Sequence, residues 1–308
     1  MIVTVTLNPA LDYLIPLDQV HPGTIHRFSR GTFAPGGKGV NVSLLLTSLG
    51  VENRALGLAA GFSGKEICRL LEEQGCTADF VHMETGYSRI NVKLRCPTGQ
   101  ETDFNGEGPE IPGPAVDALV EKLQALQPED FLVLAGSLPQ GLPETAWPRL
   151  LETCRRRGAH LVVDTTGNAL LAALPYGPFL VKPNQEELGA LFGVEITSPL
   201  QAKEYGQQLQ RMGARNVVVS LGEKGALLLE EGGRALFCHG VKGDTVSTVG
   251  AGDSLVAGFL YGYRLHGTLE GGLRWGVAAG TATAFQEGIA TGDQVKRQFP
   301  AVENPHLL

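Results

Sequence analysis

Two glycines and an acid stand at the entrance of an apolar segment near the C-terminal end of the sequence. Gly250, Ala251, Gly252 and Asp253 come directly before apolar residues that recur with helical spacing. The glycines therefore mark a loop that becomes a helix N-terminus, where unpaired N–H groups and the helix dipole attract anions such as phosphate. Asp253 has two interpretations: it caps this helix, or it is a general base that takes a proton from an attacking hydroxyl.

A second glycine-rich segment precedes another predicted helix, in the N-terminal part of the chain. Gly37, Lys38 and Asn41 stand where the helical spacing of Val40–Leu49 begins. One interpretation is a flexible turn with an exposed lysine. The other is a ligand loop, in which glycine lets a polar molecule approach the backbone while Lys38 and Asn41 bind its oxygens. The residues alone leave both interpretations open.

Four more loops begin where a predicted strand ends. Their first polar or glycine residues are Gly136 with Ser137, Asp164, Lys182 and Ser220. Open α/β sheets bind ligands at the carboxyl ends of their strands, and parallel strands bring those ends to one edge. The shared position of the loops therefore predicts one common site.

Two of these loops have a structural as well as a functional interpretation. Asn184 would cap the next helix, but with Glu187 three residues later it would also organise water around Mg²⁺, which prefers oxygen ligands. Gly222 and Gly225 would form the turn of a hairpin, or would admit a ligand at the end of their strand.

Several common motifs are absent from the sequence. There is no GxxxxGK[ST] loop, no GxGxxG after the first strand, and no HRD or DFG motif, which argues against P-loop enzymes, Rossmann oxidoreductases and protein kinases. The cysteines and histidines show no metal-ligand spacing. The net charge of −7 disfavours a nucleic-acid partner. No leader or membrane-length apolar run is present, so we expect a soluble cytoplasmic protein without a membrane partner.

Strand-like runs alternate with helical patterns along most of the chain. The expected strands are Ile2–Leu7, Phe131–Ala135, Leu161–Asp164, Phe179–Lys182 and Asn216–Leu221. The expected helices, each followed by glycine as a cap, are Val40–Leu49, Lys65–Gln74, Pro143–Arg157, Glu186–Phe192 and Ala202–Met212. This repetition predicts an α/β fold with a doubly wound, mostly parallel sheet.

Two segments depart from that repetition and predict a small β-sheet lid. Arg89–Arg95 alternates strictly between charged or polar and apolar residues, Thr102–Asn105 continues after a turn at Pro97–Gly99, and Tyr13–Phe33 has no helical period. We expect one domain over residues 1–308, with lid strands from about 12–34 and 87–106. The apolar face of the lid needs a cover, and a second copy of the chain would supply one as a homodimer.

Three segments in this order resemble the signatures of the ribokinase-like, or PfkB-type, carbohydrate kinases. They are PGGKGVNVS at 35–43, KPNQEEL at 182–188 and STVGAGDSLVAGF at 247–259, and the resemblance covers essentially the whole chain. Further segments resemble the branch that phosphorylates sugar phosphates, which contains 1-phosphofructokinase and tagatose-6-phosphate kinase. These are TLNPALD at 6–12, RINVKL at 89–94, TDFNGEGP at 102–109, AGSLP at 135–139 and VDTTGNAL at 163–170.

The resemblance implies a role for each matching position. Its catalytic positions are Asp253 as the base and Gly250, Ala251 and Gly252 as the anion hole for the transferred phosphate. Its ATP-binding positions are Lys182, Asn184, Ser220, Gly222, Gly225 and Gly252, with Gly276–Phe285 beside the adenine, while Asn184 and Glu187 act on Mg²⁺ through water. Its substrate-binding positions are Asp12, Gly37, Lys38, Asn41, Arg89 and Ser137.

The implied reaction transfers phosphate from ATP to D-fructose 1-phosphate and yields D-fructose 1,6-bisphosphate. Tagatose-6-phosphate kinase is the alternative within the branch, and a non-catalytic sugar-phosphate sensor is the alternative outside it. A substrate that already carries a phosphate needs cations on the acceptor side, so Arg89 with Lys38 and Ser137 is expected to clamp it. Lys93 and Arg95, on the same strand, are interpreted as surface charge.

Overall fold

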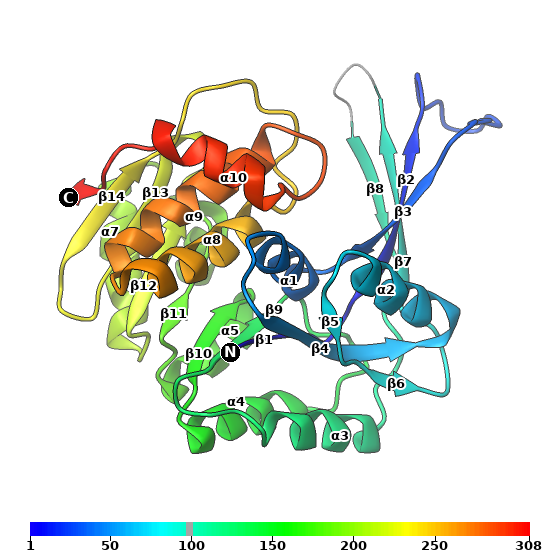
Figure 1. The fold of residues 1–308 in the computed structure, drawn as a ribbon, viewed down its shortest axis with the longest axis horizontal. Helices are drawn as coiled ribbons and strands as arrows, with labels where there is room; N and C mark the ends of the chain where they lie inside the picture. Colours follow the sequence, from blue (N-terminus) through cyan, green and yellow to red (C-terminus); the bar gives the residue numbers. More distant parts are fainter. Residues whose placement is uncertain (97–100) are drawn as a thin grey trace.

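An 11-stranded sheet forms the centre of the protein in the computed structural model, which describes residues 1–96 and 101–308 (Figure 1). The central strands run parallel in the order β12 (Asn216–Ser220), β11 (Leu180–Val181), β10 (His160–Asp164), β9 (Phe131–Ala135), β1 (Ile2–Thr6), β4 (Asn53–Ala60) and β5 (Thr77–Ala78). β6 (Val81–Met83) also pairs with β4. The expected parallel sheet is therefore confirmed.

Three antiparallel strands extend this sheet at one edge, beyond β12. They are β13 (Gly225–Leu229), β14 (Ala235–His239) and β15 (His306–Leu307). The central strands were predictable because their Val, Ile and Leu side chains are buried on both faces. β4 is absent from the expected strands because its Ala, Leu and Gly residues lack β-branched side chains.

Helices cover both faces of the sheet. One face carries α1 (Lys38–Ser48), α8 (Ala251–His266), α9 (Leu269–Ala284) and α10 (Gly292–Gln298), and their apolar residues share one core cluster. The other face carries α3 (Gly113–Leu123), α4 (Ala146–Arg157), α5 (Gly167–Ala173), α6 (Gln185–Phe192) and α7 (Pro199–Arg211). Single 3-10 turns occur at Leu174–Tyr176, Gly222–Lys224 and Phe299–Ala301. In the described part of the chain, no helix combines the length and apolarity that a membrane span requires.

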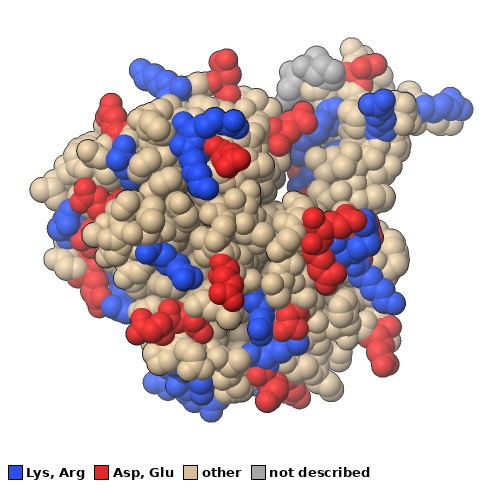
Figure 2. Space-filling view, viewed as in Figure 1, with Lys and Arg blue, Asp and Glu red and all other residues tan. Residues whose placement is uncertain are grey.

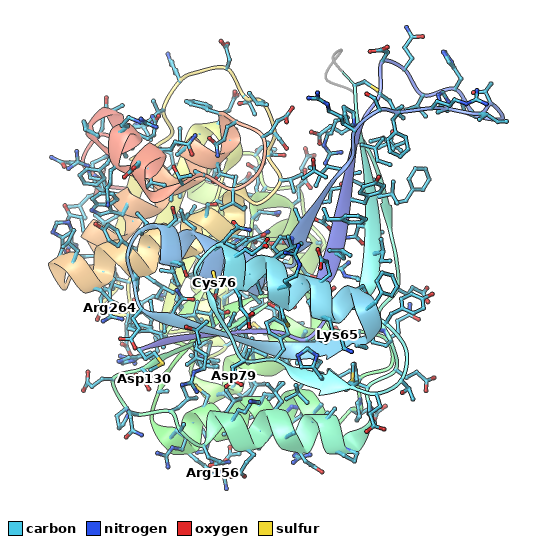
Figure 3. All side chains as sticks on the ribbon, turned by 45° about the vertical axis from the view of Figure 1, so that its right-hand side comes forward. Lys65, Cys76, Asp79, Asp130, Arg156 and Arg264 are labelled. Atoms are coloured by element: carbon cyan, nitrogen blue, oxygen red, sulfur yellow. The ribbon has the colours of Figure 1, made fainter. Side chains whose placement is uncertain are left out.

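The ends of the helices agree with the glycine signals of the sequence. α4 ends at Gly158 and α6 ends at Gly193, and both glycines adopt left-handed backbone angles, with φ 72° and 67°. α1 begins two residues earlier than expected, because Gly37 at φ 118° turns the chain directly into the helix. Arg155 and Arg156, in the last turn of α4, are exposed, and Arg156 points away from the body (Figure 3).

A separate four-stranded sheet projects from the body, and we call it the lid (Figure 1). Its strands are β3 (Thr32–Gly36), β2 (Ala10–Pro16), β7 (Arg89–Arg95) and β8 (Glu101–Asn105), in that spatial order. α2 (Gly61–Glu73) packs against β2 and β3. The strands expected at Arg89–Arg95 and Thr102–Asn105 are therefore present, while the turn expected at Pro97–Gly99 lies outside the described residues.

Candidate active site

A cleft of about 1380 Å³ lies between the lid and the carboxyl edge of the main sheet. Its lining includes the ends of β11 and β12, the starts of α1 and α8, one face of α9, and the lid strands β2, β7 and β8. In the space-filling view, a recess separates the lid from the body, and basic and acidic side chains meet in it (Figure 2). The loops that follow β11 and β12 therefore converge with the starts of α1 and α8, whereas Gly136, Ser137 and Asp164 are not among the lining residues, and the lid faces this site across the cleft.

Asp253 lies on the floor of this cleft, in the first turn of α8. α8 begins after Gly250, whose φ of 79° is left-handed, and no side chain caps the helix. The cap interpretation of Asp253 is therefore wrong. Its Oδ2 instead accepts a hydrogen bond of 2.7 Å from Nδ2 of Asn41 in α1. Through Asn41, α1 thus orients the carboxylate of a residue that follows 212 positions later in the chain.

Behind Asp253, two lysines share one buried carboxylate. Oδ1 of Asp164, at the end of β10, lies 3.0 Å from Nζ of Lys38 and 3.4 Å from Nζ of Lys182. Nζ of Lys38 is also 3.6 Å from Oε1 of Glu187. Asp164 is fully buried, and its Oδ2 has no hydrogen-bond partner among the described residues. The sequence predicts a loop at Asp164, but no motif in it indicates a role for this residue.

Burial and the neighbouring charges set the pKa of Asp253. Burial has the largest effect and, with the negative charge of Asp164, raises the pKa of Asp253 to about 6, although Lys38, Asn41 and Lys182 act in the opposite direction. For Asp164, burial is outweighed by Lys182 and Lys38, and the pKa of this carboxyl is lowered. Asp253 is therefore a carboxylate whose proton affinity suits a general base near neutral pH.

The start of α8 also offers room for an anion. A Cβ atom built on Gly252 would lie 3.2 Å from Nζ of Lys182, so the glycine keeps the space beside this ammonium open at the start of the helix. The N–H of Ala251 is already used, because it donates to the carbonyl oxygen of Thr248 at 3.2 Å. A Cβ on Gly250 would lie 2.3 Å from Cδ1 of Ile289. Gly250, Ala251 and Gly252 all line the cleft, as the anion-hole prediction requires.

The far arm of the cleft is formed by the turn after β12 and by α9. Ser220, Gly222 and Gly225 line it, together with Val277 and Thr281 of α9. The hairpin interpretation is also correct, because β12 and β13 pair antiparallel across this turn. Gly225 has a φ of 108°, and a Cβ there would lie 2.1 Å from the carbonyl oxygen of Cys238. The same glycines thus turn the chain and line the part of the cleft that α9 also lines.

Asn184 and Glu187 form a capping box at the start of α6. Oδ1 of Asn184 accepts from the N–H of Glu187 at 2.7 Å, and Oε2 of Glu187 accepts from the N–H of Asn184 at 2.8 Å. Oε1 of Glu187, which lines the cleft, is free of this capping box and lies 3.6 Å from Nζ of Lys38. No cluster of three or more metal-ligating side chains occurs among residues 1–96 and 101–308. These donors therefore suit a hydrated cation such as Mg²⁺, which keeps several waters, and not an all-protein cage.

The lid end of the cleft is built around Asp12 of β2. Its Oδ1 accepts a hydrogen bond of 2.7 Å from Nδ2 of Asn91, and its Oδ2 lies 2.7 Å from Nζ of Lys93. Gly36 makes this position possible, since a Cβ there would lie 2.7 Å from Oδ2 of Asp12. Nε of Arg89 donates to the carbonyl oxygen of Asn8 at 3.1 Å. Burial lowers the pKa of the Arg89 guanidinium, and the charge of Asp12 opposes that effect.

Two expectations about the acceptor side differ from the structure. Lys93 lines the cleft with only 13% of its side chain exposed, so its interpretation as surface charge is wrong. Arg95 fits that interpretation better, because it lies outside the cleft lining and pairs with Asp103 at 2.7 Å and Glu101 at 3.2 Å. Ser137 is exposed and is not among the residues that line the cleft, so the geometry does not support its expected place in the phosphate clamp.

Charged residues also lie at the amino-terminal ends of the parallel strands, on the side of the sheet away from the cleft, but they pair with one another. The N-terminal amine of Met1 lies 2.5 Å from Oδ1 of Asp130, and Asp79 pairs with Lys122 and Arg54. Asp130 and Asp79 both lie at the level of these strand ends, away from the lid (Figure 3). The cavity beside them measures only about 60 Å³. The cleft under the lid is therefore the candidate active site.

Comparisons with known proteins agree with this geometry. A model of the pfkB family of carbohydrate kinases matches residues 5–296. The chain is 44% identical over 307 residues to a 1-phosphofructokinase of Bacillus subtilis (strain 168), with 100% of both chains covered. It is 34% identical over 308 residues to a D-tagatose-1-phosphate kinase of Bacillus licheniformis, again with 100% of both chains covered.

Solved structures resemble both the body and the lid. Phosphofructokinase-2 from Escherichia coli, in complex with substrates and products, aligns with a TM-score of 0.91 and 31% identity over 97% of this chain and 98% of that chain. A second structure, of the tetrameric inhibited form of that enzyme, aligns with a TM-score of 0.90 and 31% identity over the same shares. The predicted fold class is therefore confirmed.

Proposed function

Because the chain belongs to the pfkB family of carbohydrate kinases, we propose that it transfers phosphate from ATP to D-fructose 1-phosphate and forms D-fructose 1,6-bisphosphate. One observation carries the proposal. A single cleft holds a buried carboxylate with a pKa of about 6 at one end and basic side chains at the other. Such a cleft can bind a sugar by a phosphate that it already carries and activate a hydroxyl at the opposite end of that sugar.

In the proposed reaction, Asp253 accepts the proton of the 6-hydroxyl group. The hydroxyl oxygen forms a bond to the γ-phosphorus of ATP, and the bond from this phosphorus to the β,γ-bridging oxygen breaks. ADP leaves with the electron pair of that bond, and the proton on Asp253 passes to solvent after the product leaves. The bond of 2.7 Å from Asn41 holds the accepting carboxylate toward the cleft during this step.

Charge develops on the transferred group, and the start of α8 is suited to stabilise it. The N–H groups of Gly250 and Gly252 would point at its oxygens, whereas that of Ala251 donates to the carbonyl oxygen of Thr248 at 3.2 Å in this structure, and the ammonium of Lys182 shares the same space. Lys182 is itself only 3% exposed and is held by Asp164 at 3.4 Å. A donor fixed in this way needs little reorganisation when the charge appears.

The remaining ATP positions follow from the far arm of the cleft. Ser220, Gly222 and Gly225 would hold the phosphates and ribose, and the face of α9 that ends near Ala284 would lie beside the adenine. Asn184 and Glu187 would hold Mg²⁺ through water, and the cation would neutralise charge on the phosphates of bound ATP. On the sugar side, Asp12, Gly37, Lys38 and Asn41 would bind hydroxyls, and Arg89 would bind the existing phosphate. Ser137 is left out because it is not among the residues that line the cleft.

A coupled assay of ADP release tests the proposal directly. The purified chain is given ATP, Mg²⁺ and one of D-fructose 1-phosphate, D-tagatose 1-phosphate, D-tagatose 6-phosphate or D-fructose 6-phosphate. We expect the highest kcat/KM with D-fructose 1-phosphate. A higher value with a tagatose phosphate would replace the substrate assignment but keep the reaction class. Absence of sugar-dependent ADP release with all four would favour the non-catalytic sensor.

We further propose that residues 1–308 act as one kinase domain whose lid joins two copies into a homodimer. Tyr13 and Phe33 stack at 4.4 Å on one face of the lid, and Phe33 and Phe104 are 47% and 59% exposed. A face of this kind is expected to be covered by a partner. The Phe33→Asp variant should sediment as a monomer where the wild type sediments as a dimer. A monomeric wild type would contradict this part of the proposal.

A further inference from the structure

Lys93 is directed into the cleft although an acid stands beside it on the neighbouring strand. In the register of β7 and β8, Lys93 is the direct partner of Asp103. Directly opposed charges of opposite sign usually pair across antiparallel strands. Oδ1 of Asp103 instead accepts from Arg95 at 2.7 Å, and Nζ of Lys93 lies 2.7 Å from Oδ2 of Asp12 on the other neighbouring strand. The lysine therefore belongs to the cleft and not to the outer charge pairs of the lid.

Lys93 and Arg89 both keep donors that nothing in the described chain accepts. An ammonium carries three N–H donors and a guanidinium carries five. In residues 1–96 and 101–308, the ion pair with Asp12 is the one salt bridge of Lys93, and the bond to Asn8 is the one side-chain hydrogen bond of Arg89. The side chain of Lys93 is 13% exposed, and Arg89 is half-buried. Charged donors that line the cleft without protein acceptors are available to an anionic ligand.

The charges at this end of the cleft also require Lys93. Among its lining residues on the lid, Asp103 is neutralised by Arg95, which leaves Arg89, Lys93 and Asp12. With Lys93 present, two cations stand against one carboxylate, and the lid end of the cleft carries a net positive charge. Without Lys93, Arg89 only balances Asp12, and a phosphate dianion would have to bind beside an uncompensated carboxylate. A site for a sugar phosphate therefore needs the second cation.

We propose that Lys93 binds the phosphate that the acceptor sugar already carries, together with Arg89, and thereby makes the site selective for phosphorylated sugars. Arg89 and Lys93 lie on the same face of β7, four residues and about 13 Å apart along the strand. Their long side chains can reach one group from two sides, with Asn91 and Asp12 between them. Lys93 thus joins the sugar's phosphate to the carboxylate that binds its hydroxyls. This inference rests on the proposed kinase function.

A purely structural role for Lys93 makes a different prediction. If Lys93 only positions Asp12, a neutral hydrogen-bond donor would replace it, and its loss would lower kcat because the sugar would be misoriented. If Lys93 binds phosphate, its positive charge is needed, and its loss would raise KM for the sugar phosphate with kcat largely kept. Lys93→Met, Lys93→Gln and Lys93→Arg separate these roles. Lys65→Met is the matched control, because Lys65 is an exposed lysine of α2 outside the cleft (Figure 3).

The experiment measures kcat, KM for D-fructose 1-phosphate and KM for ATP in these four variants. We expect Lys93→Met and Lys93→Gln to raise KM for the sugar phosphate by about 10- to 100-fold, the range typical of a lost hydrogen bond to a charged group. KM for ATP should change less than about threefold. Lys93→Arg should recover most of the loss, and Lys65→Met should behave as the wild type. Thermal unfolding of each variant verifies that the lid and body remain folded.

Two results would overturn the inference. One is a KM for the sugar phosphate in Lys93→Met that stays within about threefold of the wild type. The other is full recovery in Lys93→Gln, which would assign Lys93 to Asp12 alone. If the wild type turns over another sugar phosphate instead, the variants are compared with that substrate, and only the proposed substrate fails. If it turns over none, calorimetric binding of D-fructose 1-phosphate decides, and equal affinity of wild type and Lys93→Met rejects the inference.

Discussion

The two ends of the cleft contain the same pair of residues in different electrostatic settings. At the floor, Asp253 accepts from Asn41 at 2.7 Å, and at the lid, Asp12 accepts from Asn91 at 2.7 Å. The difference lies in the nearest lysine. Lys93 contacts Asp12 directly, whereas the lysines near Asp253 are held by another carboxylate, Asp164.

This difference explains how one type of side chain performs two tasks. The carboxylate of Asp12, in a direct ion pair with Lys93, is suited to bind hydroxyls. A buried carboxylate without a direct cation keeps more affinity for a proton, and the pKa of Asp253 rises to about 6. Asp164 contributes twice, because it draws Lys38 and Lys182 away and adds its own negative charge. The position of the lysines therefore decides which aspartate binds and which acts as the base.

The largest expected effect comes from removing the base at the floor. Asp253→Asn should lower kcat by at least about 10²-fold, because the hydroxyl loses its proton acceptor. KM for ATP should stay near that of the wild type, since the nucleotide arm is untouched. Steady-state kinetics on the purified variant measure both quantities, and near-normal turnover would remove Asp253 from the role of base.

At the lid, the corresponding change should act on binding. Arg89→Ala should raise KM for the sugar phosphate by about 10- to 100-fold, because charge-assisted hydrogen bonds to the phosphate are lost. KM for ATP should change far less, and the ratio of the two effects is the readout. Equal increases in both constants would show that the lid does not distinguish the two ligands.

The pH dependence of turnover should report the floor and not the lid. Since the pKa of Asp253 in the free protein is about 6, we expect kcat/KM to fall about tenfold per pH unit on the acidic side of that value, as the base becomes protonated. Arg89→Ala serves as the control, because its acid limb should keep the same midpoint while KM changes. If the midpoint of the acid limb shifts in Arg89→Ala, the titrating group is the phosphate of the substrate and not Asp253.

The smallest expected effect is on stability. The pKa of Asp253 is raised in the folded state from 3.8 to about 6, so folding favours its protonated form. The stability linked to this proton is fully present below pH 3.8 and is lost as pH rises through about 6. Asp253→Asn should therefore be more stable than the wild type at pH 7.5 by on the order of 3 kcal/mol, with the difference becoming small near pH 4. Thermal unfolding at both pH values measures this, and an equal difference at both would contradict it.

Much of this arrangement was predictable from the sequence. The loops that follow buried strands had to meet at one edge of a parallel sheet, so Lys182, Ser220 and the start of α8 were expected together, and they do line one cleft. The alternation of Arg89–Arg95 likewise predicted a strand with one polar face. These conclusions depend only on local periods and on the direction of parallel strands.

The partners of individual charges were not predictable in the same way. Lys93 and Arg95 lie on the same face of β7 in the alternating pattern. Lys93 nevertheless pairs with Asp12 in the cleft, whereas Arg95 pairs with Asp103 outside the cleft lining. The register of β7 with β2 and β8 brings these partners within reach. The importance of Asp164 depends on its contacts with Lys38 of α1 and with Lys182, which directly follows β11. Asp253 failed as a cap because the left-handed Gly250 starts α8 three residues before it. Each case depends on contacts between segments that are distant in the chain.

The most direct test of the division between the two ends is the affinity of Asp253→Asn for D-fructose 1-phosphate, measured by calorimetry in the absence of ATP. If the lid binds the sugar phosphate and the floor performs the chemistry, the dissociation constant should stay within about threefold of the wild-type value although turnover is lost. A dissociation constant raised as much as that of Arg89→Ala would contradict the account, because Asp253 would then be a binding group like Asp12.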